Sequence, residues 1–449
     1  LAKRTSDDTN ILARSKTAAQ SSTCVWPPKV KGNTKMTVSI TEQCPFQNLR
    51  WFDKTCRKLV LNHLSQLHYG AILLVEGQEK TLLGDAKGEL QCTLTVLDPD
   101  FYQKMMFAGS VGAGESYILG QWRCDNLTVL VQLLARNSSI LDKLESAWAR
   151  LSKPALKLLD WRNRNTKEQS RKNISAHYDL GNAMYQLFLD PSMMYSSAVY
   201  ETDTCTLEQA QLNKLKSICD KLQLKATDHL IEIGTGWGSM AIFAARNYGC
   251  KVTTTTISRE QHDYAAEKIR EAGLESQITL LFQDYRDLTG TYDKLVSIEM
   301  IEAVGDEFLD QYFAKCSSLL KEDGLMVLQA ITIADQRYSH YVKEVDFIKR
   351  YIFPGGCLPS IQRMSNAVAD YTDLVLRQVQ DIGLDYARTL QDWCHNFMAS
   401  RDKLHQLGYD DQFIRLWHFY LCYCEGGFLE RATSAVHLVF TKPMNRNKI

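Results

Sequence analysis

The stretch at residues 229–241 most constrains the fold, because a short apolar run is followed at once by glycines and then by an apolar-periodic helix. Residues 230–233 are typical of a buried strand, and Gly234, Gly236 and Gly238 follow them. Glycines at this spacing let the backbone turn tightly and bring a ligand close to a helix N-terminus, where free N–H groups attract negative charge. The stretch predicts a site for a nucleotide-like ligand, and a plain strand-to-helix turn is the alternative.

The spacing of these glycines narrows the choice of ligand. Gly-x-Gly-x-Gly with Glu232 inside the strand differs from the dinucleotide fingerprint Gly-x-Gly-x-x-Gly, and it resembles the first motif of class I methyltransferases that use S-adenosylmethionine (SAM). We therefore expect Gly234, Thr235 and Gly236 to contact SAM, whereas Glu232 orients the turn.

Apolar runs alternate with amphipathic helices from residue 173 onwards. Helices are expected at residues 207–222 and 308–320, and further strands at residues 251–257, 278–282, 292–298, 325–333 and 438–442. This alternation predicts an α/β fold, with a doubly wound, Rossmann-like parallel sheet whose ligand lies at the carboxyl ends of the strands.

Polar residues follow the second and third of these strands. Thr256 and Gln261 carry groups that can hydrogen-bond a ribose. Asp284 can accept a hydrogen bond from an adenine amino group, and Tyr285 can pack on the ring face. A helix cap or a surface position is the alternative for each residue, but together they favour an adenosyl ligand.

Composition excludes several classes of protein. A chain of 449 residues has room for roughly two or three domains. Acidic and basic residues balance at 52 each, so no global field favours nucleic acid. The 13 cysteines are scattered and contain no Cys-x-x-Cys pair, which argues for reduced thiols in a cytoplasmic protein and against a metal site. No apolar run is long enough to span a membrane.

The chain divides into segments of different composition. We expect a disordered leader at residues 1–43 with Met36 as a candidate start, an α+β domain at 44–153, a linker at 154–173, the methyltransferase domain at 174–442 and a frayed basic tail at 443–449. Lipid docking and dimerisation are alternative roles for the α+β domain. The mostly basic residues 162–172 form either a solvated linker or a strip that touches anionic lipid head groups.

The α+β domain shows a helical pattern followed by strands. The helix is expected at residues 48–68, and strands at 71–75, 80–83 and 90–97 would form an antiparallel meander. The glycine-rich residues 109–117 follow a helical segment at 101–108 and have no lysine partner. A phosphate loop is therefore not expected there.

Three aromatic-rich stretches follow the fifth strand, at residues 338–351, 390–407 and 413–423. Their apolar residues exceed what one face of a helix needs, which predicts a helical lid over the carboxyl edge of the sheet. We expect an acyl channel lined by Phe347, Ile348, Phe353, Trp417, Phe419 and Tyr420, with a purely structural helical cap as the alternative.

Several longer segments carry a family resemblance. The segments are residues 177–182, 194–198, 256–261, 283–287, 302–305 and the string Tyr351-Ile-Phe-Pro-Gly-Gly-Cys-Leu-Pro-Ser360. They resemble the cyclopropane fatty acid synthase family, which includes the mycolic acid cyclopropane synthases. The resemblance runs from about residue 173 to 442, and residues 44–153 resemble more weakly the N-terminal domain of the phospholipid-acting members.

This resemblance implies a reaction and a set of catalytic groups. A methyl group passes from SAM to a cis double bond of an acyl chain, and a proton is then lost to close a cyclopropane ring. The family uses bound bicarbonate as the base. By resemblance, Glu302 holds this anion, Tyr386 contributes its hydroxyl and ring, Ile331 contacts the anion through its backbone, and Tyr195 and Ser196 belong to the SAM site.

Two positions depart from the commonest family pattern. Ser197 stands where many members have cysteine, and Gln329 where many have histidine. Both can hydrogen-bond, but neither carries the charge of a histidinium, so the anion would be bound more weakly or in a different arrangement. The combination of Glu299 with Gln329 resembles a branch of the family.

Three further residues carry weaker expectations. Cys424 matches a cysteine once assigned to the family's active site, although a buried structural thiol is the commoner fate of such a residue. His177 and Tyr178 precede the methyltransferase motifs and would close over the cofactor, with a core histidine as the alternative.

The leading hypothesis is a SAM-dependent cyclopropane synthase that acts on unsaturated phospholipid acyl chains and is peripherally associated with the membrane. A homodimer and a monomer are both left open. A second hypothesis keeps the methyl transfer but ends in a methyl-branched or methylene chain, because the proton can leave from a different carbon. A third is a lipid- or SAM-binding protein without catalysis.

Overall fold

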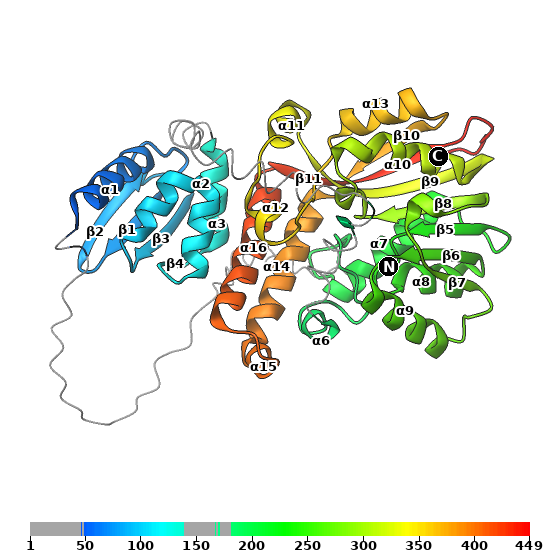
Figure 1. Cartoon of the computed structure of the whole chain (residues 1–449), viewed down its shortest axis with the longest axis horizontal. Helices are drawn as coiled ribbons and strands as arrows, with labels where there is room; N and C mark the ends of the chain where they lie inside the picture. Colours follow the sequence, from blue (N-terminus) through cyan, green and yellow to red (C-terminus); the bar gives the residue numbers. More distant parts are fainter. Residues whose placement is uncertain (1–45, 47–48, 139–166, 168, 171–180) are drawn as a thin grey trace, which may run out of the picture. The chain divides into compact units, whose positions relative to one another are not determined.

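The computed structural model describes residues 46, 49–138, 167, 169–170 and 181–449 (Figure 1). The expected leader, His177, Tyr178 and most of the basic segment 162–172 lie outside the described residues. None of the helices in the described residues is both long and apolar enough to cross a bilayer.

The N-terminal part is a small α+β unit. Its elements are α1 (Trp51–Leu64), β1 (Gly70–Glu76), β2 (Glu79–Gly84), β3 (Leu90–Val96), α2 (Asp100–Ile118), β4 (Trp122–Cys124) and α3 (Leu127–Arg136). The four strands lie in the order β2-β1-β3-β4. Residues 110–117 are helical, and Gly109, with φ +51°, forms a kink within α2.

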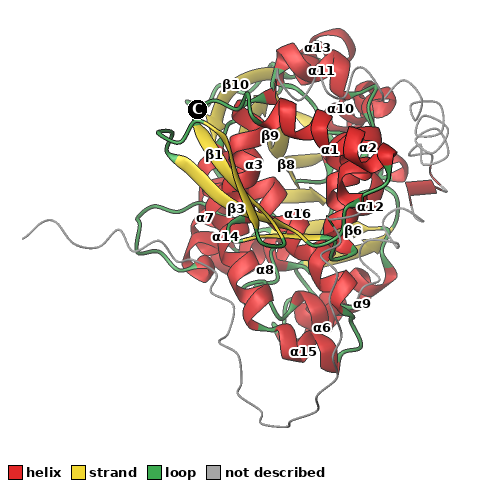
Figure 2. Cartoon of the chain, turned by 90° about the vertical axis from the view of Figure 1, so that its left-hand side faces the viewer, coloured by secondary structure: helices red, strands yellow, loops and turns green. Residues whose placement is uncertain are grey.

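One strand pairing differs from the predicted meander. β2 pairs antiparallel with β1 as expected, but β3 pairs parallel with β1, with Gly70 opposite Leu90 (Figure 2). Between β2 and β3 the chain runs against the backbone of Tyr69 and Gly70, at the start of β1. At this crossing a Cβ on Gly88 would lie 2.2 Å from the backbone nitrogen of Gly70, so only glycine allows the short connection.

The second part is built on a mixed seven-stranded sheet. Its strands are β5 (His229–Ile233), β6 (Lys251–Thr256), β7 (Ile278–Phe282), β8 (Tyr292–Ile298), β9 (Leu320–Ile333), β10 (Val375–Asp381) and β11 (Thr433–Thr441). The order is β10-β11-β9-β8-β5-β6-β7. β7, β6, β5, β8 and β9 are parallel as predicted, whereas β11 and β10 add an antiparallel edge. The fold is therefore a Rossmann-like α/β sheet, but it is not wholly parallel.

Helices cover both faces of this sheet, and others pack beyond its strand ends in a separate core. The helices of this part are α6 (Asn182–Tyr185), α7 (Leu207–Leu222), α8 (Ser239–Tyr248), α9 (Arg259–Glu271), α10 (Leu309–Ser318), α11 (Asp335–Tyr341), α12 (Phe347–Tyr351), α13 (Ile361–Tyr371), α14 (Gly383–Ala399), α15 (Arg401–Gln406) and α16 (Asp411–Leu429). One apolar core joins α10 and α13 to one face, and another joins α7, α8 and α9 to the opposite face (Figure 1). The short helices η1 (Tyr285–Asp287), η2 (Ile301–Ala303) and η3 (Asp306–Phe308) follow strand ends.

The expected frayed tail is wrong at its start. The side chain of Asn445 is buried, and its amide donates to the backbone oxygen of Asp323 at 2.7 Å. The backbone N–H of Met444 donates to Glu322. These bonds tie the segment after β11 to the first residues of β9, where the pairing with β8 shifts in register.

The α3 helix packs directly on α16. The hydroxyl of Thr128 donates to Glu425 at 2.8 Å, and Gln132 and Arg136 both donate to Glu430, at 2.8 and 2.6 Å. The two helices are in close contact at Gly426, where an added Cβ would lie 2.7 Å from Val131. The contact between the helices therefore depends on the absence of a side chain at this position.

Replacing Gly426 with alanine is expected to lower the free energy of unfolding by about 1–3 kcal/mol, because the methyl group overlaps Val131. Thermal unfolding measures this. The matched control is Gly427→Ala on the same helix, where the nearest atom is 3.6 Å away. There the gain in helix propensity should leave stability unchanged or raised by up to about 1 kcal/mol. Equal melting temperatures for the two variants would contradict the close approach.

Candidate functional site

A cavity of about 830 Å³ lies along the carboxyl ends of the central strands. Gly234 follows β5, Thr256 ends β6, Asp284 follows β7 and Glu299 follows β8, and all four residues line it. The cavity is therefore in the position predicted for a ligand of a doubly wound sheet.

The glycine turn presents an open face to this cavity. Gly236 has a φ of +53° and an ideal Cβ built on it would meet no atom within 4 Å. Gly234, with φ +97°, faces Met300, whose side chain would be 3.2 Å from such a Cβ. The left-handed backbone and the empty space together let a ligand lie against the main chain, which is what a bound nucleoside requires.

All residues expected to contact SAM line the cavity. They are Tyr195, Ser196, Gly234, Thr235, Gly236, Thr256, Gln261, Asp284 and Tyr285. Thr256 donates its hydroxyl proton to the amide oxygen of Gln261 at 3.0 Å, which holds the two polar groups side by side. The ring of Tyr285 packs edge-on against Tyr312, with ring centroids 5.5 Å apart. Open glycine backbone, hydroxyls and an amide make a donor set that fits the adenosyl part of SAM.

Asp284 is held as an ionised carboxylate. Burial raises its pKa, but hydrogen bonds from the backbone and guanidinium of Arg286 outweigh this effect and leave the pKa below its usual value. The guanidinium donates to both carboxylate oxygens at 2.8 Å. A carboxylate offers about four acceptor positions, so one remains for an amino group of a ligand.

The lid supplies most of the predicted acyl channel. Ile348, Phe353, Phe419 and Tyr420 line the cavity. Phe347 and Trp417 do not, because both are fully buried in helix packing. The ring of Phe347 lies 4.7 Å from that of Phe419, and the Trp417 ring stacks on Phe397 at 6.0 Å.

The cavity also extends into the N-terminal part, which sequence reasoning did not foresee. Its lining there is apolar and includes Leu64, Ile72, Leu94, Phe101, Trp122 and Leu130. These residues come from α1, α2, α3 and the small sheet. The space is therefore bounded by both parts of the chain.

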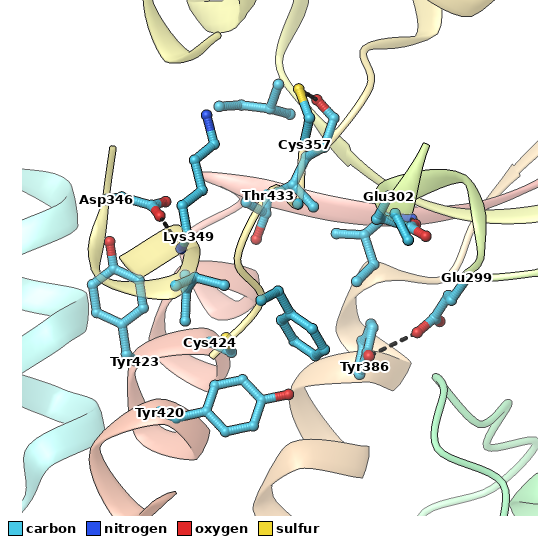
Figure 3. A pocket seen from close by; sticks show the side chains of 18 of the residues that line it. Glu299, Glu302, Asp346, Lys349, Cys357, Tyr386, Tyr420, Tyr423, Cys424 and Thr433 are labelled. Carbon is cyan, nitrogen blue, oxygen red and sulfur yellow. Dashed lines mark hydrogen bonds between the residues drawn. The ribbon is translucent and has the colours of Figure 1, made fainter. Parts of the chain in front are cut away.

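Two carboxylates, those of Glu299 and Glu302, line the cavity just after the end of β8 (Figure 3). Glu299 accepts three hydrogen bonds. Its Oε1 receives the backbone N–H of Ser197 at 2.9 Å and the side-chain amide of Gln329 at 2.8 Å. Its Oε2 receives the hydroxyl of Tyr386 at 2.8 Å, and Figure 3 shows these two side chains pointing toward each other.

Gln329 is itself oriented by His437, one strand away. Its Oε1 is 2.9 Å from Nε2 of His437, and since a carbonyl oxygen only accepts, the imidazole must donate. Burial lowers the pKa of His437 to about 3, so the ring is neutral. The Gln329 amide nitrogen then faces Glu299 and the backbone oxygen of Ser197. Gln329 and Ser197 do not line the cavity, and they act on Glu299 through the hydrogen bonds that they donate to it.

Glu302 is held differently. Its Oε1 accepts the backbone N–H of Ile331 at 2.5 Å, while its Oε2 is buried without a hydrogen-bond partner. Burial, and then the charge of Glu299, raise the pKa of Glu302 to about 8. Glu302 is thus mostly a neutral acid at pH 7. Burial also raises the pKa of Glu299, but the hydrogen bonds from Ser197, Gln329 and Tyr386 and the charge of Lys214 oppose this rise.

A buried lysine, Lys214, lies near Glu299 but does not line the cavity. Lys214 of α7 is fully buried and donates to the hydroxyl of Ser196 at 2.7 Å. Burial lowers the pKa of Lys214 to about 8, and the nearby charges of Glu299 and Asp190 oppose this change. The lysine therefore favours the charged form of Glu299.

The donors that the resemblance assigns to bicarbonate are already engaged by the chain's own carboxylates. Tyr386 donates to Glu299 and the Ile331 N–H to Glu302. Gln329 also donates to Glu299. The side chains of Glu299 and Glu302 therefore occupy the three donors that bicarbonate would need, and only Oε2 of Glu302, buried without a hydrogen-bond partner, stays open to an anion. This donor set, as arranged, does not fit a bound bicarbonate.

Cys424 lines the cavity, but burial raises the pKa of its thiol, which leaves it a poor nucleophile. A second thiol group lies elsewhere. Cys394, His418 and Cys422 bring their ligand atoms within 4.8 Å of one another on α14 and α16. The helical fold creates this grouping, which the spacing of the cysteines did not reveal.

Sequence reasoning missed the central roles of Glu299, Lys214 and His437. The pairing of Glu299 with Gln329 in the sequence was the one available signal. Lys214 and His437 lie within ordinary helix and strand patterns and gave none.

Comparison with known proteins decides the family. A family model described as mycolic acid cyclopropane synthetase matches residues 165–438. The chain belongs to the mycolic acid cyclopropane synthetase family. The match covers the whole sheet up to β11, and it confirms the resemblance read from the motifs. This family member is accordingly a SAM-dependent methyltransferase.

Relatives at similar distances differ in their named reactions. The chain is 36% identical to the cyclopropane-fatty-acyl-phospholipid synthase of Escherichia coli (strain K12) over 79% of this chain and 89% of that protein. It is 37% identical to the tuberculostearic acid methyltransferase UfaA1 of Mycobacterium tuberculosis over 71% of this chain and 76% of that protein.

Solved structures of the family confirm the fold. The mycolic acid cyclopropane synthase CmaA1 complexed with SAH and CTAB is 28% identical, with a TM-score of 0.57 over 61% of this chain and 98% of that chain. The cyclopropane synthase MmaA2 from Mycobacterium tuberculosis gives 27% identity and the same TM-score and coverage.

Proposed function

We propose that this family member transfers a methyl group from SAM to a cis double bond in an acyl chain of a membrane phospholipid, and that the product is a cyclopropane ring. The observation that carries the proposal is one cavity that joins a glycine cradle, a pair of carboxylates and an apolar channel. SAM supplies the methyl group on a sulfonium, an electrophile strong enough for an alkene. The chain's residues must bind both reactants, exclude water and remove a proton.

The lining of the cavity supports each of these tasks. Aromatic side chains from the lid, among them Phe353 and Tyr420, can face the positive charge that forms on the acyl chain. Their burial keeps water away from this cation. Glu299 and Glu302 line the same cavity as the lid residues and the glycine turn.

A phospholipid substrate is supported by the N-terminal part. Its apolar lining continues the channel, so this part would dock the lipid. Trp51, at the first turn of α1, is 80% exposed, and tryptophan favours the lipid–water interface. These features support peripheral contact with a membrane in the cytoplasm. Dimerisation, the other role expected of this part, stays a prediction.

A methyl-branched or methylene product is the second candidate. It is favoured by the 37% identity to a protein named as a tuberculostearic acid methyltransferase. Both products come from the same cation and differ in the carbon that loses the proton.

The test is expression of the full chain in a bacterial host that lacks its own cyclopropane synthase. Mass spectrometry is expected to show fatty acids heavier by one CH₂, and proton NMR should show ring protons. Ring protons distinguish the cyclopropane from a methylene isomer of equal mass. Gly236→Leu, which fills the glycine cradle, should abolish the product. Unchanged lipids from folded protein that binds SAM would instead favour the binding protein without catalysis.

A further inference from the structure

Glu299 occupies the centre of the hydrogen-bond donors that would otherwise hold an anion. We infer that Glu299 itself is the proton acceptor of the reaction, so that the enzyme needs no bound bicarbonate; this inference rests on the proposed function. Its carboxylate is covalently attached and lines the same cavity as Glu302. A mobile anion is thereby replaced by a side chain.

The contacts of Glu299 suit a base that must stay ionised and accept one proton. The backbone N–H of Ser197, the amide of Gln329 and the hydroxyl of Tyr386 can only donate to it as arranged. Three donors stabilise the charged form and occupy three of about four acceptor positions. The free position on Oε2 remains for a proton. Engaged lone pairs also make the carboxylate a weaker nucleophile toward the methyl group.

The backbone of Glu299 supplies an independent observation. Its φ is +48°, a left-handed conformation that is uncommon and strained for a residue with a side chain. Its backbone N–H donates to the oxygen of Gln329 at 2.8 Å, which fixes this geometry. Strain of this kind is retained at functional sites, and here it aims the carboxylate at the three donors.

The proton transfer conserves atoms and electrons. The π electrons of the double bond form a bond to the methyl carbon, and sulfur keeps the pair of the broken C–S bond. The acyl chain is then a carbocation. A proton of the transferred methyl group passes to Glu299, the electrons of that C–H bond close the ring, and the neutral acid later returns the proton to water. Loss from a chain carbon to the same residue gives the methylene product.

The experiment compares Glu299→Gln and Glu299→Gly with the wild type, with and without bicarbonate. Glutamine keeps the size and an acceptor but removes the base. Glycine relieves the left-handed strain and frees Ser197, Gln329 and Tyr386 to bind an anion. S-adenosylhomocysteine release from unsaturated phospholipid vesicles is measured in CO₂-free buffer and after addition of bicarbonate, with chloride at equal ionic strength as the control.

The wild type is expected to be equally active in both buffers. Glu299→Gln should be slower by about 100-fold or more and unresponsive to bicarbonate. Glu299→Gly should be similarly slow without bicarbonate and at least about tenfold faster with it. Wild-type activity that is lost without bicarbonate and restored by it would overturn the inference, as would full activity of Glu299→Gln.

A second readout does not depend on activity. Bicarbonate should raise the melting temperature of Glu299→Gly and leave that of the wild type unchanged. An equal increase in both proteins would also overturn the inference. Absence of any wild-type turnover in either buffer would refute the proposed function, while the melting temperatures would still decide whether Glu299 fills the anion site.

Discussion

Replacing Gly236 with leucine is expected to raise the dissociation constant for SAM more than about 100-fold while the protein stays folded. The position has open space on the cavity side, so the new side chain would enter the space predicted for the cofactor. A 100-fold loss corresponds to roughly 2.7 kcal/mol. Isothermal titration calorimetry with SAM measures the change directly and needs no lipid substrate.

The chain offers a matched control for backbone strain. Gly273 also has a positive φ, +65°, and an added Cβ there would meet no atom within 4 Å. It follows α9 and does not line the cavity. Gly273→Leu should therefore lose similar stability but keep its affinity for SAM. If the two variants bound SAM equally well, the cofactor would have to lie away from the glycine turn.

Glu302→Gln is expected to stabilise the protein increasingly as the pH rises from 5 to 8. In the folded wild type the pKa of Glu302 is about 8, against 4.5 for an ordinary glutamate. The unfolded chain thus releases this proton at a lower pH than the folded chain, and the wild type loses stability between the two values. Over pH 6 to 8 the difference between variant and wild type should grow by on the order of 2 kcal/mol.

Thermal unfolding at several pH values tests this expectation. Glutamine can still accept the N–H of Ile331, so the local structure is preserved. Glu275→Gln, at an exposed position, changes the formal charge equally without removing a buried acid. A constant difference between Glu302→Gln and the wild type from pH 5 to 8 would show that Glu302 is ionised throughout.

Local patterns predicted most of the central sheet. The strands β7 and β8 and the helix α7 have the predicted bounds, because each has a clear apolar period and flanking turn residues. β10 was missed since most of its side chains are exposed at the sheet edge, which leaves no apolar run. The parallel pairing of β3 was missed for another reason. It depends on a chain crossing at Gly88 that no strand pattern encodes.

In the site, too, residues that follow a local pattern could be predicted, and residues that depend on contacts between distant segments could not. Most cofactor residues were predictable because they lie at or just after the ends of strands of a known type of sheet, whereas Tyr195 and Ser196 were implied only by the family resemblance. The role of Glu299 was not, since its partners Ser197, Gln329 and Tyr386 are 102, 30 and 87 positions away in the sequence. Only the folded chain brings these donors together. The apolar residues Phe347 and Trp417 were misassigned because hydrophobicity alone does not tell a channel wall from a core.

The shared boundary of the cavity limits how this chain can be divided or recombined. α16 contributes Phe419 and Tyr420 to the channel, and through Gly426 it also contacts α3. A hybrid that took residues 46–138 from one relative and the remaining sequence from another would place unmatched surfaces on these two helices. Exchanging α16 together with the N-terminal part would keep both the helix contact and the channel wall. The unit of exchange in this enzyme is therefore discontinuous in sequence.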